Sequence, residues 1–533
     1  MAEGRDWWRG SVTYQIYPRS FMDSNGDGIG DLKGITDRLD HVASLGVDAI
    51  WLSPVFPSPM ADMGYDVSDY LGIDPTFGTM DDFDAMLAKA HGLGLKVIID
   101  QVLSHCSDQH PFFIESRKSR NNAKADWFIW ADPNPDGTPP NNWLSIFGGP
   151  AWEWDSSRRQ YYLHNFLKEQ PDWNFHNPAV QDYLIECMRF WLDKGVDGFR
   201  LDTVNFYFHD KKLRDNPANY EPWAENAVRP FEMQFTLFSK NQPENLAFIE
   251  RMRALLDEYE DRTMVGEVGD SHHSIEIMGK YTSGKRLHMA YSFEMLGPDF
   301  SPSHFRGRVE SFFSMAPNGW PCWAFSNHDV PRHVTRWLEH CEDPDALAKQ
   351  AAALLLALQG SICIYQGEEL GQTDTELSFD ELTDPEGINF WPEKKGRDGC
   401  RTPMVWDENA PNAGFSEANR TWLPVKDAQR AKAVSTQGDD DSVLAFYRAM
   451  LALRRREVAL NAGDIRFIET EDPILGFERG DDVVCLYNLS AGNHSMTLDH
   501  PLQPLIGQGV DLEGTEVKFG PNGFIIGRVE SGN

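Results

Sequence analysis

Short apolar segments alternate with longer amphipathic segments along the first hundred residues of the chain. The short segments are rich in β-branched and aromatic residues, which is typical of buried strands, and the longer ones repeat apolar residues at helical spacing. The strand-like segments are 11–18, 48–55 and 96–103, and the helix-like segments are 31–46 and 80–94. Strands and helices that alternate in this way predict parallel βαβ units.

The alternation stops between residues 106 and 175, which are rich in Asn, Pro, Asp, Trp and Gly and have little helical periodicity. It resumes with a helix-like segment at 178–195 and strand-like segments at 197–204, 262–268, 286–295, 321–329 and 361–370. Residues 206–245 are polar and Pro-rich, so we expect them to form a second, smaller insertion at the mouth of a barrel. The whole pattern predicts an α/β fold, a (β/α)8 TIM barrel with a loop-rich subdomain inserted after its third strand.

The pattern changes to short alternating strands near residue 458. These strands are expected at 464–469, 474–480, 482–489 and 523–529. They predict a C-terminal antiparallel β-domain, which we expect to be a β-sandwich. We therefore divide the chain into the first part of a catalytic barrel (1–105), an inserted subdomain (106–175), the second part of the barrel (176–457) and the C-terminal domain (458–533).

Composition and charge narrow the classes of partner. The chain of 533 residues is 41% hydrophobic and 12% aromatic, which is ample for a large core. Its 49 basic and 82 acidic residues give a net charge of −33, which repels phosphate backbones and anionic lipids. We therefore expect neither a nucleic-acid partner nor a membrane, whereas a neutral sugar is indifferent to this charge. The excess of acidic residues is consistent with a saline habitat and equally consistent with a role in keeping the protein in solution.

The N-terminal segment and the cysteines bear on location. The first ten residues lack the basic-then-apolar layout of a secretory signal, and no apolar run has membrane-spanning length. The seven cysteines are scattered and form no CxxC pair. This distribution favours reduced thiols over a disulfide framework or a zinc site, so we expect a cytoplasmic protein.

Four strand-like segments deliver an acidic residue at their carboxyl ends: Asp100, Asp202, Glu267 and Asp329. Parallel barrels place their catalytic groups at those ends, beneath the βα loops. Several carboxylates that converge on one mouth are the groups required to break a glycosidic bond. Three basic residues accompany them, namely His105, Arg200 and His328.

Local context suggests a role for three of these acids. Arg200 and Asp202 are two apart on one strand, so their side chains share a face, and the guanidinium would keep a nucleophilic carboxylate ionised. Apolar neighbours of Glu267 would raise its pKa, as a general acid requires. Asp329, beside His328, could stabilise an oxocarbenium-like transition state. The structural alternatives are an Arg–Asp pair in the barrel floor and a glutamate that caps the next helix.

The loop from Asp23 to Asp31 places oxygen ligands at alternating positions, as in the first half of a calcium-binding loop. The twelfth position is Gly34 rather than Glu, so the loop is not an EF-hand. It predicts a structural Ca²⁺ or Mg²⁺ site, and the alternative is a plain loop of Asx turns. The expected ligand residues are Asp23, Asn25, Asp27, Ile29 and Asp31.

With these motifs the chain closely resembles the α-amylase family of glycoside hydrolases, family 13, and most of all its α-glucosidases and oligo-1,6-glucosidases. The resemblance covers nearly the whole length, from WWRGSVTYQIYPRSFMDSNGDGIGDL to the C-terminal β-domain. It implies that Asp202 is the nucleophile, Glu267 the acid/base and Asp329 the transition-state stabiliser. It also implies a Ca²⁺ or Mg²⁺ ion in the Asp23 loop and no organic cofactor.

The resemblance also implies a pocket for the nonreducing-end glucose. Arg397 in GRDGCRTPMVWD matches the arginine that reaches this sugar, and Arg401 is the weaker candidate. The other residues that match the family's pocket are Asp62, Tyr65, His105, Phe147, Phe166, Arg200 and His328.

Finer features of the resemblance concern specificity. The segment 170–174, QPDWN, is similar to the QPDLNW signature of exo-acting glucosidases, with Trp in place of Leu. Thr203 follows the nucleophile, where α-1,4-restricted relatives have Thr and α-1,6-preferring relatives have Val. Ser104 departs from the Asn that many relatives carry before the histidine, which affects one hydrogen bond and no catalytic role.

These features imply a retaining exo-α-glucosidase that acts on short α-1,4-glucosides such as maltose, with transglucosylation as a side activity. A sucrose-acting glucosidase, or a glucosyltransferase or isomerase of the same family, stays open as the alternative. The RLDRD segment of sucrose isomerases is absent. A non-catalytic scaffold, like the heavy chains of amino-acid transporters, lacks the catalytic carboxylates that this chain keeps. The expected partner is a small oligosaccharide, and the protein is expected to be a monomer or homodimer.

Overall fold

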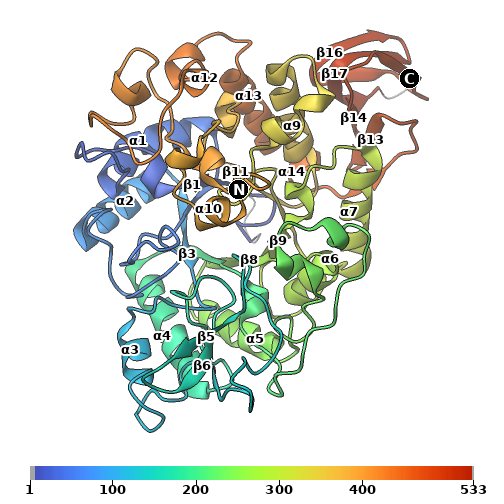
Figure 1. The fold of residues 1–533 in the computed structure, drawn as a ribbon. Coiled ribbons are helices and arrows are strands. Elements are labelled where there is room, and N and C mark those ends of the chain that lie inside the picture. Colours follow the sequence, from blue (N-terminus) through green and yellow to red (C-terminus); the bar gives the residue numbers. More distant parts are fainter. Residues whose placement is uncertain (1–5, 531–533) are drawn as a thin grey trace.

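Eight parallel strands form the central sheet of the protein, and the sheet curls into a barrel (Figure 1). The computed structural model describes residues 6–530. The barrel strands are β1 (Val12–Ile16), β2 (Ala49–Leu52), β3 (Lys96–Gln101), β7 (Gly198–Leu201), β8 (Thr263–Val268), β9 (Met289–Ser292), β10 (Cys322–Trp323) and β11 (Ser361–Tyr365). Each lies within a strand-like segment expected from the sequence.

The order of the strands is β10-β11-β1-β2-β3-β7-β8-β9, and an isolated parallel bridge between Ala290 and Pro321 joins the two edges. The barrel is therefore nearly closed. Nearly all of its strand residues are buried, as is usual for parallel sheets that helices cover. The predicted fold class, a (β/α)8 barrel followed by an antiparallel C-terminal domain, is confirmed.

Helices surround the barrel, and the connections between successive strands run through them. Asp31 begins α1 by accepting a 2.6 Å hydrogen bond from the Gly34 amide, and Thr79 begins α2 with a capping box. The longer helices are α1 (Leu32–Leu45), α2 (Met80–Gly92), α4 (Pro178–Lys194), α5 (Asn245–Leu256), α6 (Ser274–Thr282), α7 (Pro302–Met315), α9 (Pro344–Ala357) and α13 (Val443–Arg456). The shorter ones are α3 (Pro111–Ser116), α8 (His333–Arg336), α10 (Pro385–Phe390), α11 (Asp398–Arg401), α12 (Asp427–Arg430) and α14 (Val458–Ala462).

The interior of the barrel is a separate apolar cluster beneath the strand ends. Trp51, Val265 and Met289 belong to it and are almost fully buried. At the start of β7, a Cβ on Gly198 would come within 2.1 Å of the Thr263 carbonyl oxygen. Only glycine therefore allows β7 and β8 to approach this closely. Asp202 directly follows β7, and Glu267 belongs to β8.

The segment between β3 and α4 forms a small antiparallel sheet at the bottom of Figure 1. Its strands are β4 (Trp130–Ala131), β5 (Trp152–Asp155) and β6 (Gln160–Leu163). It also contains the short helix α3, which the sequence did not suggest and which begins at a proline after the His110 cap. A bridge between His105 and Asp172 joins the two ends of this segment. It therefore returns to the barrel close to where it leaves.

Six antiparallel strands form the C-terminal sheet, which packs against α9 and α7. Four lie where the sequence predicted strands: β12 (Ile465–Phe467), β13 (Ile474–Arg479), β14 (Val483–Asn488) and β17 (Glu516–Val529). The sequence missed β15 (His494–Thr497) and β16 (Leu502–Glu513). Both are mostly half-buried or exposed, so they lack the apolar runs that mark the other strands.

Across residues 6–530, no helix combines the length and the apolar character that crossing a bilayer requires. All seven cysteines are free, and six of them are buried.

Candidate active site

The candidate residues meet at the carboxyl ends of the barrel strands. Asp202 directly follows β7, and Glu267 is the last residue but one of β8. Asp329 lies in the loop after β10. Asp62 and His105 come from the loops after β2 and β3. All of these loops open on the same face of the barrel, as the sequence predicted.

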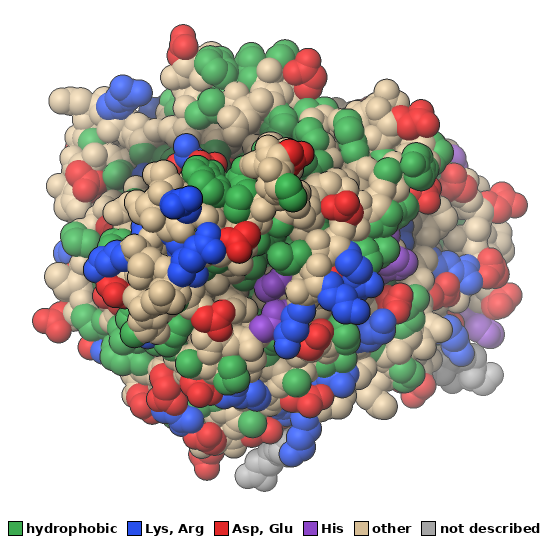
Figure 2. All heavy atoms as spheres, turned by 60° about the horizontal axis from the view of Figure 1, so that its bottom comes forward, with side chains coloured by type: hydrophobic (Ala, Val, Ile, Leu, Met, Phe, Trp, Pro, Cys, Tyr) green, Lys and Arg blue, Asp and Glu red, His purple; other side chains and the backbone are tan. Residues whose placement is uncertain are grey.

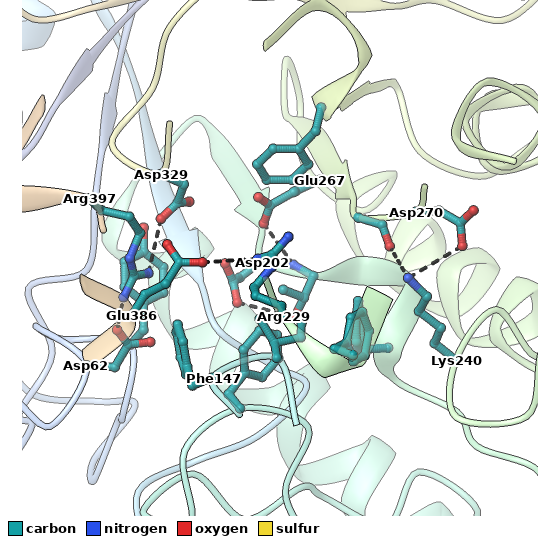
Figure 3. A pocket seen from close by; sticks show the side chains of 18 of the residues that line it. Asp62, Phe147, Asp202, Arg229, Lys240, Glu267, Asp270, Asp329, Glu386 and Arg397 are labelled. Atoms are coloured by element: carbon teal, nitrogen blue, oxygen red, sulfur yellow. Dashed lines mark hydrogen bonds and ion pairs between the residues drawn. The ribbon is translucent and has the colours of Figure 1, made fainter. Parts of the chain in front are cut away.

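A cavity of about 290 Å³ lies at this face. Figure 3 shows Asp202 and Glu267 in its middle, with Asp62 and Arg397 on one side and further charged residues on the other. Ten of the twelve expected catalytic and substrate-binding residues line it: Asp62, Tyr65, His105, Phe147, Phe166, Asp202, Thr203, Glu267, Asp329 and Arg397. Arg200 and His328 are fully buried behind these residues.

The Arg200 guanidinium holds three carboxylates together. Its Nη1 lies 2.9 Å from Asp100 and 2.6 Å from Asp202, and its Nη2 lies 2.5 Å from Glu267. The Tyr291 hydroxyl accepts a further hydrogen bond of 2.8 Å. The predicted pairing of Arg200 with Asp202 is therefore present, while the contacts with Asp100 and Glu267 were not expected. Asp100 is buried below the cavity, so it supports the site rather than facing a substrate.

The surroundings shift the pKa values of two cavity carboxyls in opposite directions. Burial raises the pKa of Glu267 well above its usual range; Arg200 opposes this rise, and the charges of Asp202 and Asp329 add to it. Burial also raises the pKa of Asp329, but the guanidinium groups of Arg397 and Arg401 outweigh burial and lower it below its usual range. Glu267 therefore favours its protonated form while Asp329 stays ionised.

Two arginines hold Asp329 in place. Arg401 Nη2 lies 2.9 Å from Asp329 Oδ1, and Arg397 Nη1 lies 3.3 Å from the same atom. Arg397 also binds Asp62 at 2.8 Å and Asp384 at 2.6 Å. Of the two arginines that the sequence offered, Arg397 lines the cavity, and Arg401 lies beneath it as a partner of Asp329. Asp384 was missed because nothing in its sequence context distinguishes it from an ordinary helix cap.

His328 is held by two side chains. Its Nδ1 lies 2.8 Å from Gln15 Nε2, and its Nε2 lies 2.5 Å from the Tyr65 hydroxyl. The Tyr65 ring stacks on the imidazole at 5.2 Å. Burial lowers the pKa of His328 well below its usual range, and the charge of Asp329, which raises it, does not compensate. The imidazole is therefore neutral and positions Tyr65 and Asp329 from behind.

Thr203 has an unusual backbone beside the acids. Its φ of 42° lies in the left-handed region, which is rare for a β-branched residue. Its amide donates to Glu267 Oε2 at 3.1 Å, and its hydroxyl lies 2.8 Å from that of Ser104. Ser104 also contacts His105 Nδ1 at 2.8 Å. The serine that departs from the family's pattern therefore still takes part in the hydrogen bonds of the site.

The walls combine aromatic rings with charges that the sequence analysis missed. The Phe166 ring lies 5.0 Å from that of His105, and the Arg397 guanidinium lies 5.0 Å from the centroid of Phe147. The missed lining residues include Phe206, Arg229, Phe231, Lys240, Asp270, Phe293, Glu386 and Lys394. Several come from the irregular segment 206–245, whose sequence has no periodicity that would orient a side chain.

The expected cation loop lies apart from the cavity, because none of its residues lines it. Asp23 accepts hydrogen bonds from the amides of Asn25 (3.0 Å) and Gly28 (2.8 Å), and Asp27 accepts one from the Ile29 amide (2.9 Å). These are Asx-type turns. Over residues 6–530, no three His, Cys, Asp or Glu side chains converge as metal ligands do. The donor set of the loop is nevertheless all oxygen, which suits a hard cation.

A buried carboxyl with a raised pKa beside a second carboxylate, at the carboxyl end of a (β/α)8 barrel, is an arrangement that glycoside hydrolases use. The profile of the α-amylase catalytic domain matches residues 15–463, so the chain belongs to the α-amylase family. It is 56% identical over 541 residues to a probable α-glucosidase of Rhizobium meliloti, covering 98% of this chain and 97% of that protein. It is 39% identical to an oligo-1,6-glucosidase of Heyndrickxia coagulans, covering 88% and 89%.

Solved structures agree with this assignment. The α-glucosyl transfer enzyme XgtA superimposes with a TM-score of 0.95 at 51% identity, covering 99% of this chain and 100% of that one. The trehalulose synthase MutB of Pseudomonas mesoacidophila superimposes with a TM-score of 0.89 at 32% identity, covering 99% and 100%. The chain thus groups with α-glucosidases and oligo-1,6-glucosidases, and its structural neighbours include an α-glucosyl transfer enzyme and a trehalulose synthase.

Proposed function

We propose that the protein is a retaining exo-α-glucosidase that releases terminal glucose from short α-1,4-glucosides such as maltose. The observation that carries this proposal is the guanidinium group of Arg200, which lies behind the cavity and binds two acids that line it, Asp202 and Glu267. Two carboxylates that share one guanidinium suit the close spacing of retaining enzymes, about 5–5.5 Å.

In the proposed reaction, protonated Glu267 donates its proton to the glycosidic oxygen while Asp202 attacks the anomeric carbon. The bond to the leaving sugar breaks and a β-glucosyl ester forms on Asp202. Deprotonated Glu267 then takes a proton from water, whose oxygen displaces Asp202 and regenerates the acid. Asp329, kept ionised, stabilises the positive charge that develops on the sugar ring in both steps.

Other cavity residues would bind the terminal glucose. Asp62, His105 and Arg397 offer a carboxylate, an imidazole and a guanidinium to its hydroxyls, with Tyr65 beside them. Arg200 and His328 would act from behind, by holding the acids and Tyr65. Phe147 and Phe166 would pack on the apolar faces of the sugar.

Transfer of the glucosyl group to another sugar or alcohol is the second candidate outcome. The similarity to the α-glucosyl transfer enzyme XgtA favours it. It needs no residue beyond those of hydrolysis, because an alcohol can replace water in the second step. Sucrose is a further candidate substrate, and the similarity to MutB, one solved structure of which holds the substrate sucrose, supports testing it.

We also propose that the loop 23–31 binds Ca²⁺ or Mg²⁺. The ligands would be side-chain oxygens of Asp23, Asn25, Asp27 and Asp31 and the carbonyl of Ile29. The ion would fix the connection between β1 and α1 and supply no chemistry to the reaction.

One assay tests the proposed activity. Initial rates are measured on maltose, isomaltose, sucrose and p-nitrophenyl α-glucoside, with the products separated by chromatography. We expect maltose to be the best of the three disaccharides and α-glucose to be the first product. Faster turnover of isomaltose or sucrose would contradict the proposed linkage preference, and no hydrolysis of any α-glucoside would contradict the function.

A further inference from the structure

Lys240 is a buried cation at the wall of the cavity. It belongs to the irregular segment 206–245, and its side chain is only 3% exposed. Its Nζ lies 4.9 Å from the ring centroid of Phe206 and 5.5 Å from that of Phe231, two other lining residues. No role in the proposed reaction accounts for a charge in this position.

Lys240 lies on the side of the acids away from the expected glucose pocket. Figure 3 shows Lys240 and Asp270 on one flank of Glu267 and Asp202, and Asp62 and Arg397 on the other. The scissile bond must lie at the two acids. A substrate whose terminal glucose contacts Asp62 and Arg397 therefore extends its leaving group toward Lys240.

The ammonium group keeps one donor for a ligand. Nζ donates to the Gly269 carbonyl at 2.6 Å and lies 3.4 Å from Asp270 Oδ2. These two are the polar contacts of Nζ within the described part of the chain, and an ammonium carries three protons. Among residues 6–530 the third proton has no acceptor, although burial makes an unpaired donor costly.

Asp270 has no comparable hydrogen-bonding capacity left for a ligand. Its Oδ1 accepts hydrogen bonds from the amides of His272 (2.9 Å) and His273 (2.8 Å). Its Oδ2 accepts one of 2.7 Å from the Asn241 side chain and also faces Lys240. Asp270 therefore fixes the loop and neutralises Lys240, and the unused hydrogen-bonding capacity of the pair belongs to the lysine.

The backbone that Lys240 touches is also held independently. Asn205 Nδ2 donates to the Gly269 carbonyl at 3.0 Å, and the Gly269 amide donates to Asn205 Oδ1 at 3.1 Å. The loop that follows Glu267 thus keeps two hydrogen bonds if Lys240 is replaced. A purely structural lysine would be redundant here.

We propose that Lys240 is a specificity residue of the leaving-group site. Its free N–H donates a hydrogen bond to a hydroxyl of the second sugar, either the departing sugar of a disaccharide or the acceptor in transfer. The Asp270 carboxylate offsets its charge, which favours a neutral polyhydroxylated group over an anionic one. This inference rests on the proposed function.

The test compares maltose with α-glucosyl fluoride, whose leaving group has no hydroxyls. In Lys240→Met, which keeps much of the length and apolar contact but no donor, kcat/KM should fall about tenfold more for maltose than for the fluoride. That factor corresponds to losing one hydrogen bond from a charged donor. Equal losses on the two substrates would overturn the inference, because a structural role affects both alike.

Lys349→Met is the matched control. Lys349 is also a largely buried lysine with an ion pair, 2.6 Å to Asp441, but it lies on α9 and does not line the cavity. It should leave the maltose-to-fluoride ratio at the wild-type value. If it shifts the ratio as much as Lys240→Met does, the inference fails. A wild-type protein inactive on both substrates would instead overturn the proposed function, and the inference with it.

A measurement on the wild-type protein does not depend on how the variant folds. Glucosyl transfer from α-glucosyl fluoride is measured with glucose and with each monodeoxyglucose as acceptor. Removal of the hydroxyl that attacks stops transfer in any case, so the other hydroxyls are compared. One of them should matter more than the rest, so that its removal lowers transfer several-fold. Equal transfer to all the acceptors that keep the attacking hydroxyl would overturn the inference.

Discussion

At the residue scale, the planar guanidinium group of Arg200 organises the candidate site, because two of its nitrogen atoms bind different acids. Arg200 reaches Asp202 through Nη1 and Glu267 through Nη2, and it also pairs with Asp100. A lysine in this position would offer a single point charge and could not hold the acids in a fixed arrangement. The same guanidinium limits the mutual repulsion of the carboxylates, while burial still leaves Glu267 with a raised pKa.

The assignment of Glu267 as general acid leads to a first prediction. Glu267→Gln should lower kcat/KM for maltose by roughly 10²–10⁴-fold, because the departing sugar oxygen needs a proton. The loss of kcat/KM should be much smaller for α-glucosyl fluoride, since kcat/KM reports the first step and fluoride leaves without protonation. Asp202→Asn is the control, because removal of the nucleophile should abolish turnover of both substrates. Equal losses in Glu267→Gln would contradict the role.

The raised pKa of Glu267 also fixes the sign of the pH dependence. The general acid must be protonated, so kcat/KM for maltose should fall as the pH rises through its pKa. In Glu267→Gln this alkaline limb should be absent. A pH–rate profile of the two proteins measures both, and an unchanged alkaline limb in the variant would assign it to another group.

A second prediction concerns Thr203. Thr203→Val keeps β-branching at a residue with φ of 42° but removes the hydroxyl that contacts Ser104 at 2.8 Å. We expect the ratio of maltose to isomaltose turnover to shift several-fold toward isomaltose, with a loss of stability of about 1 kcal/mol. Thr203→Ser, which retains the hydroxyl, should stay close to wild type. An unchanged ratio in the valine variant would remove Thr203 as a determinant of linkage.

At the scale of elements, the barrel was predictable because each strand is encoded locally. Segments such as 96–103 are mostly apolar and rich in β-branched residues, and all eight gave a strand. The contact of Arg200 with Asp202 was also predictable, since it depends only on the two-residue period of one strand. The contact with Asp100 was not, because it requires the register of β3 against β7, which pairs Asp100 with Arg200.

The other residues of the site could not be predicted, because they lie in segments without periodicity. Lys240 and Arg229 lie in a segment of loops and short 3-10 turns, where spacing along the chain says nothing about direction. Asp384, which binds Arg397, precedes the short helix α10 and looks like a common cap. Only the folded arrangement brings these residues to the cavity.

The loop between β1 and α1 carries a third prediction. If it binds Ca²⁺ or Mg²⁺, chelation should lower the melting temperature, because a ligand at 100 times its Kd contributes roughly 2.7 kcal/mol. Maltose turnover at moderate temperature should change little, since no loop residue lines the cavity. Asp27→Ala removes an exposed expected ligand and should abolish the effect of added cation. Identical melting curves with chelator, Ca²⁺ and Mg²⁺ would contradict the site.

At the scale of the whole molecule, the cavity combines residues that are far apart in the sequence. Asp62 and Arg397 are separated by 335 positions and lie 2.8 Å apart. The site therefore exists only when both halves of the barrel have closed. This dependence ties activity to global folding, so conditions that stabilise the whole barrel also preserve the site.

The net charge of −33 is one such global property, and it gives the last prediction. Figure 2 shows basic side chains interspersed with acidic ones on one face, and pairs between them offset part of the repulsion. The excess of acidic over basic residues leaves the rest of the repulsion in place. Salt shortens the Debye length from about 10 Å at 0.1 M to about 3 Å at 1 M, which screens the remaining repulsion. The melting temperature at neutral pH should therefore rise as NaCl increases, with most of the gain below about 0.5 M, where screening changes fastest. A rise that continues linearly to high salt would indicate general salting-out instead. A fall would mean that ion pairs at the surface, such as Arg189 with Glu258, outweigh the net repulsion.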